Sequence, residues 1–86
     1  MDIALAGIAP VQAEAGDRNA ALETVARIRD ETWKAVALQG VAEKLVQTGH
    51  EKDAVDLAAK QASPVHKAYV LLGVVLGKAK VKAPEE

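Results

Sequence analysis

The hexapeptide ALAGIA at residues 4–9 returns 33 residues later as ALQGVA at residues 37–42, and a shortened third copy begins at Tyr69 with YVLLGVV. Shifting the whole chain by the same 33 positions also brings Gly16 onto Gly49 and Ala21 onto Ala54. A fixed period of this length is typical of helical repeat proteins, in which each copy is one supersecondary unit. The period predicts a single domain over residues 1–80, with repeats near 3–35 and 36–68, a partial repeat at 69–80, and a polar tail at 81–86.

Each copy carries the signals of two helices joined by a turn. The apolar stripe of the first helix stops at Gly16 in one copy and at Gly49 in the other, and glycine suits the left-handed conformation that ends a helix. Asp17 can cap the helix that follows, and Ser63-Pro64 is a strong helix start. We therefore expect five helices near residues 2–15, 18–29, 31–48, 51–62 and 64–80. The fold class predicted is all-α, built from tandem antiparallel helical hairpins that form an α-α superhelix.

The apolar residues of this chain are mostly small. Alanine dominates, phenylalanine is absent, and Trp33 and Tyr69 are the only aromatic residues. Small side chains let helices approach closely but bury little area each, and strand-forming residues are few. Gly7, Gly40 and Gly73 recur with the period, which indicates a role in helix packing.

Charge and composition exclude several classes of protein. The net charge of −1, with acids and bases interspersed, lacks the basic footprint of a nucleic-acid binder. Without cysteine there are no disulfides and no thiolate metal sites. The longest apolar run, residues 68–77, is too short for a bilayer, which needs about 20 residues, and the N-terminus lacks the basic segment of a signal peptide. We expect a cytoplasmic protein.

The repeat resembles the tetratricopeptide repeat, a helical hairpin of about 34 residues. In that family small residues lie where the two helices of a hairpin cross. The resemblance rests on Leu5, Ile8, Ala9, Gly16 and Ala21 in the first copy and on Leu38, Val41, Ala42, Gly49 and Ala54 in the second. The period here is one residue shorter than the family's, and the family's aromatic positions hold Leu5, Gln12 and Val25. Its closing proline has no counterpart at Trp33.

The resemblance also implies a binding surface. In the family, partner peptides lie in a concave groove lined by the first helix of each repeat. Carried over to this sequence, the groove would be lined by Ile3, Ala6, Pro10, Val36, Gln39, Glu43, Val46 and Gln47. The basic and asparagine residues that clamp a peptide carboxylate in some members are absent there, so the expected partner is a helix or an extended apolar segment of another protein.

No catalytic centre, metal site or cofactor site is expected. Ser63 is the only serine, and its place before Pro64 marks it as a helix cap. His50 and His66 are 16 positions apart, without the spacing of paired metal ligands. Surface or capping roles are predicted for both histidines, and the chain is expected not to be an enzyme.

The last helix is apolar most of the way round, which favours burial against protein. Repeat arrays bury their cores by stacking and usually end in a helix with a polar outer face. We therefore predict self-association, as a homodimer, through Tyr69, Leu72, Val75 and Leu76. Two alternatives stay open. The helix could bind a membrane surface, with Lys78, Lys80 and Lys82 as a basic flank, or the sequence could be an excerpt of a longer repeat array.

Overall fold

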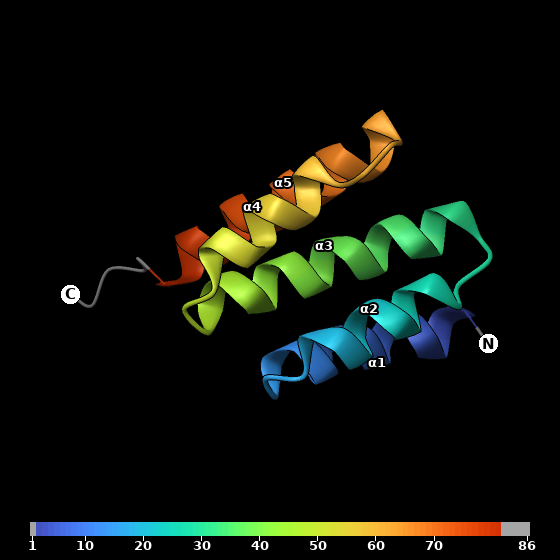
Figure 1. Ribbon diagram of the computed structural model, residues 1–86, viewed down its shortest axis with the longest axis horizontal. Coiled ribbons are helices and arrows are strands. Elements are labelled where there is room, and N and C mark those ends of the chain that lie inside the picture. Colours follow the sequence, from blue (N-terminus) through green and yellow to red (C-terminus); the bar gives the residue numbers. More distant parts are fainter. Residues whose placement is uncertain (1, 82–86) are drawn as a thin grey trace.

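The helices follow one another without any strand over residues 2–81, which are the residues that the computed structural model describes. Figure 1 shows the five of them along the chain. Their bounds are Asp2–Glu14 for α1, Arg18–Ala26 for α2, Glu31–Gln47 for α3, Glu51–Ala59 for α4 and Pro64–Val81 for α5. The all-α, five-helix prediction is confirmed.

The helix boundaries have the local causes that the sequence indicates. Gly16 and Gly49 have φ angles of 93° and 87°, a region that favours glycine, and they close α1 and α3. At the helix starts, the side chains of Asp17, Asp30 and Ser63 each accept a hydrogen bond from the backbone N–H three residues ahead, at 3.1, 3.0 and 3.3 Å. These bonds satisfy N–H groups that have no partner inside the helix.

The short helices α2 and α4 end three residues before the positions that the sequence predicts. The N–H of Arg27 donates to the carbonyl oxygen of Thr24, and that of Lys60 to the carbonyl oxygen of Leu57. Both hydrogen bonds join residues three apart, as in a 3-10 helix, and a turn of this kind often forms the end of an α-helix. At the other end of the chain α5 runs through Val81, one residue into the predicted tail, and residues 82–86 lie outside the described part.

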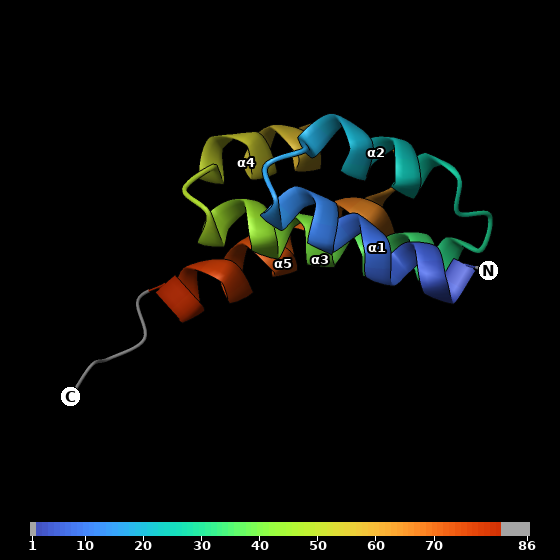
Figure 2. The same ribbon diagram turned by 90° about the horizontal axis from the view of Figure 1, so that it is seen from below.

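The helices form two layers, seen edge-on in Figure 2. The long layer contains α1, α3 and α5 side by side, with α3 between the other two, and the short layer contains α2 and α4. Within each hairpin the helices pack against each other, α1 on α2 and α3 on α4. No Cα atom of α2 lies within 8 Å of one in α4. The long layer therefore holds the two hairpins together.

Small side chains form half of the core: among the described residues, nine buried alanines stand beside nine buried valines, leucines and isoleucines. Ala9, Ala21, Ala42 and Ala54, the small repeat positions, are completely buried. Two glycines bring the long helices still closer. A Cβ atom on Gly40 would lie 2.6 Å from Cγ of Pro10 on α1, and a Cβ atom on Gly73 would collide with the carbonyl oxygen of Gln39 on α3. Since neither site has room for a methyl group, these glycines set the spacing of the long layer.

Enlarging a side chain at this spacing should cost stability. We expect Ala42→Leu to lower the free energy of unfolding by about 1–3 kcal/mol, because the added atoms overpack the contact between α3 and α5. The matched control is Ala59→Leu on the exposed side of α4, which should change the free energy of unfolding by less than about 0.5 kcal/mol. Urea unfolding followed by circular dichroism measures both. Equal midpoints for the two variants would contradict this packing.

Candidate interaction surfaces

The residues predicted to line a groove lie on two helices of the long layer, α1 and α3, but only some of them are at the surface. Ile3 on α1 and Val36 on α3 are exposed. The half-buried members are Pro10, Gln39, Glu43 and Gln47. Ile3, Val36 and Tyr69 occupy equivalent positions of the three repeats, so each long helix contributes one large apolar side chain at this position.

Two residues of the predicted groove belong to the core instead. Ala6 and Val46 are each only 6% exposed and are part of the buried cluster. Val46 lies on the side of α3 that faces α5, with its Cβ 2.8 Å from the position that a Cβ atom on Gly77 would take. The prediction that these two face a partner was wrong, because the long helices approach too closely to leave the sides between them open.

Glu43 is engaged within the protein. Its carboxylate forms an ion pair with Lys80 of α5 and accepts a hydrogen bond of 3.2 Å from Nε2 of Gln47, one turn further along α3. Its side chain is only 15% exposed. Glu43 therefore ties α3 to the end of α5, which explains a charged residue at a helix contact.

The outer side of α5 is an uncovered apolar surface. Of the residues predicted for self-association, Leu72 and Val75 are 46% and 61% exposed, and Tyr69 and Leu76 at their edge are half-buried. Two further exposed side chains extend this surface. They are Val65 and Leu71. Neither was among the predicted contact residues, although both belong to the apolar run that the sequence shows.

A second apolar surface lies at the opposite end of the long layer and was missed by the sequence analysis. Ile8 and Val11 on α1 are exposed, beside Ile3. Next to them Gly7 has no atom within 4 Å of the place where a Cβ atom would stand. The available signal was the repeat itself, since the counterparts of Ile8 in α3 and α5, Val41 and Val74, are buried.

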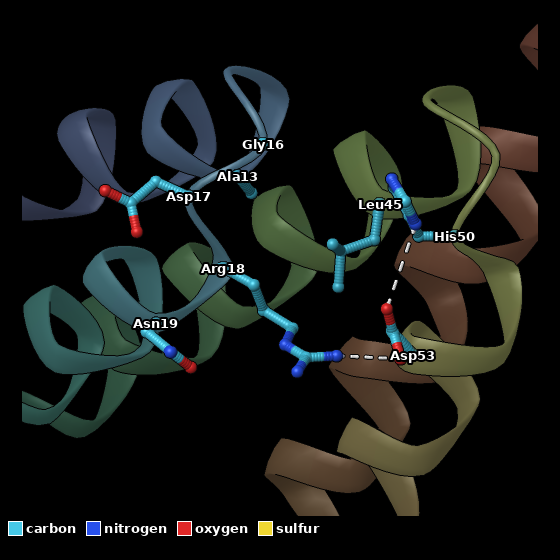
Figure 3. A pocket seen from close by; sticks show the side chains of 8 residues that line it. All are labelled: Ala13, Gly16, Asp17, Arg18, Asn19, Leu45, His50 and Asp53. Atoms are coloured by element: carbon cyan, nitrogen blue, oxygen red, sulfur yellow. Dashed lines mark ion pairs between the residues drawn. The ribbon is translucent and has the colours of Figure 1, made fainter.

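The cleft between α2 and α4 is the polar hollow of the molecule (Figure 3). It has two lobes, with cavity volumes of about 290 and 390 Å³, above Leu45 of α3. Arg18 on α2 reaches across to Asp53 on α4, with 2.8 Å between Nη1 and Oδ1. His50 approaches the same carboxylate, at 3.9 Å between Nδ1 and Oδ2. Asp17, Asp56 and Lys60 also line the cleft, so acidic and basic side chains alternate along it.

The two histidines have different environments. His50 is exposed at the start of α4, in agreement with a surface role. His66 is buried, and its Nε2 lies 2.9 Å from Oε1 of Glu31 at the start of α3. Of the predicted surface or capping role, the surface part was wrong for the side chain of His66, because the first turn of α5 packs beside that of α3. Within residues 2–81, no three side chains of the metal-ligating types converge on one point.

Reversing the charge of Glu43 should weaken the contact between α3 and α5. We expect Glu43→Lys to lower the free energy of unfolding by about 1–2 kcal/mol, because it removes the bonds with Lys80 and Gln47 and faces one ammonium group with another. The control is Glu23→Lys on the exposed side of α2, expected to change stability by less than about 0.5 kcal/mol. Urea titration at low salt measures both, and equal values would show that the ion pair contributes nothing.

Comparisons with known proteins do not extend these observations. No protein-family model, no curated protein and no solved structure matches this chain. In the described part of the chain, no helix is long and apolar enough to cross a membrane. The tetratricopeptide resemblance stays a prediction, and the proposals below rest on the repeat and on the surfaces of the helices.

Proposed function

We propose that this chain is a non-catalytic protein-interaction scaffold that associates with itself through the outer face of α5, with a homodimer as the smallest assembly. The observation that carries the proposal is the exposure of Leu71, Leu72 and Val75 on the last helix of the long layer. Contiguous apolar patches on soluble proteins often mark interaction sites, whereas apolar side chains exposed singly are common and need no explanation.

The free energy gained by burying these apolar side chains is large enough to support an interaction. Full burial of a Leu or Val side chain contributes about 1.5–3 kcal/mol relative to leaving it in water. Covering Leu72 and Val75, each roughly half exposed, yields a substantial part of that for each residue and each chain. The whole stability of a small domain is only about 5–15 kcal/mol, so the gain is large on the scale of the fold.

A membrane surface is the less favoured partner. That alternative requires a free basic flank at the end of α5, but Nζ of Lys78 lies 3.0 Å from Glu51, and Lys80 is paired with Glu43. Lys82 lies outside the described residues. The lysines that the structure places at this end of α5 therefore bind carboxylates of the same chain. Co-sedimentation with anionic vesicles tests the alternative directly.

A charge placed on the apolar face should separate the chains. We expect Leu72→Glu to give a particle of 9.0 kDa, the mass of one chain, where the unchanged protein gives a larger mass at micromolar concentration. The reason is that a buried carboxylate without a partner outweighs the apolar contacts around it. Multi-angle light scattering measures the masses. Val55→Glu on α4, equally exposed in this structure, is the control and should keep the larger mass.

A single mass of 9.0 kDa for the unchanged protein over the whole micromolar range, with a cooperative thermal transition, would contradict self-association.

A further inference from the structure

The long layer contains two junctions, α1 with α3 and α3 with α5, and in each a glycine of the later helix lies against the earlier one. We name the side of a long helix that meets the preceding long helix its N-side face, and the side that meets the following one its C-side face. The N-side face of α5 is Val70, Gly73, Val74 and Gly77, all buried. Gly73 lies against Gln39 and Ala42 of α3, and Gly77 lies against Glu43 and Val46. The C-side face of α3 is therefore Gln39, Ala42, Glu43 and Val46.

The repeat places the counterparts of both halves of this junction on the first and the last described helix, α1 and α5. Counting back two periods of 33 from the N-side face of α5 gives Ala4, Gly7, Ile8 and Val11 on α1. All four are exposed, although their counterparts in α5 are buried. Counting forward one period from the C-side face of α3 gives Leu72, Val75, Leu76 and Ala79 on α5. Three of these are exposed and Leu76 is half-buried.

We propose that copies of this chain stack head to tail, with the C-side face of α5 in one copy packed on the N-side face of α1 in the next. The contact continues the interfaces that already join α1 to α3 and α3 to α5. The inference rests on the proposed self-association through α5 and identifies the partner surface. Because the two surfaces differ, the assembly extends copy by copy until it closes into a ring or grows as a filament.

The fit of the two faces favours this partner. By the register of the junction between α3 and α5, Val75 takes the place of Ala42 and meets Gly7, where nothing lies within 4 Å of a Cβ position. A valine against a glycine already occurs inside the chain, where Val46 contacts Gly77. Both end faces are apolar throughout, so their contact buries no charge.

A symmetric pairing of two α5 helices has no such fit. It would place the bulky side chains of Leu72, Val75 and Leu76 against the same three from the other copy. The glycines of α5 that permit a close approach, Gly73 and Gly77, are on its other side and buried against α3. Head-to-tail stacking sets Val75 against a glycine, as Val46 is set against Gly77 within the chain; one turn further along, Val11 of α1 stands where α3 has Lys44 and α5 has Gly77.

Two blocking variants distinguish the arrangements. Val75→Glu disables only the α5 face and Gly7→Glu disables only the α1 face, and both positions are exposed in the single chain, so the fold should be retained. We expect each variant alone to scatter light as a particle of 9.0 kDa. Mixed in equal amounts, they should form a particle of twice that mass, because each brings one intact face. Circular dichroism verifies that both variants are folded.

The outcomes separate this inference from the proposed function. If Gly7→Glu keeps the mass of the unchanged protein, the contact does not involve α1, and stacking is overturned while self-association through α5 stands. If the mixture stays at 9.0 kDa although the unchanged protein is larger, stacking is also overturned. If the unchanged protein is itself monomeric, both proposals fail.

Gly7→Ala provides a second measurement that does not depend on adding a charge. In the single chain the new methyl group enters open space and raises helix propensity, so the melting temperature of the dilute protein should rise. In the stack it would meet the neighbouring copy as a Cβ on Gly73 would meet Gln39. We expect association at least tenfold weaker despite the more stable chain. Unchanged association would overturn the proposal.

Discussion

The close approach of neighbouring helices in the long layer is the contact on which the rest of the structure depends. Alanine and glycine bury little area each, so a core made of them is stable only if backbones come near enough for many dispersion contacts. Gly73 allows this by letting α5 touch the carbonyl oxygen of Gln39, and Gly40 does the same for Pro10. The short helices could not replace this contact, because α2 and α4 do not pack on each other.

Ion pairs define how the elements meet at the edges of this packing. His66 contacts Glu31 where α3 and α5 start, Lys80 contacts Glu43 near the end of α5, and Arg18 joins α2 to α4 across the cleft. In each pair one partner, Arg18, Glu31 or Lys80, is exposed, and pairs open to solvent contribute about 1 kcal/mol or less each. Their effect is therefore on register and orientation, while most of the stability comes from the buried apolar core.

The packing contact between neighbouring long helices is made inside the described chain, but the equivalent surfaces on the outer sides of α1 and α5 are uncovered. Within the chain the N-side faces of α3 and α5 are covered, but α1 exposes Ile8 and Val11, and α5 exposes Leu72 and Val75. Natural arrays usually end in polar capping helices. Here both described ends are apolar, and this distribution of side chains is what connects the fold with association.

The sequence by itself determined the number of helices and where they start, because caps and turns act over about four residues. Gly16, Asp17 and Ser63 could be interpreted without knowing any distant contact. The period also identified the small positions that are buried, such as Ala42, and the apolar outer face of α5.

Only the tertiary structure decided which sides of the helices are covered. The helix propensity of a residue does not depend on whether its side of the helix faces solvent or another helix. The burial of Ala6 and Val46 therefore could not be predicted from their positions in the sequence. Lys80, the charged partner of Glu43, and Glu31, the partner of His66, lie 37 and 35 residues away in the chain, beyond any local signal. The open face of α1 follows from the same cause, since whether a side chain meets solvent depends on which neighbour the fold places beside it.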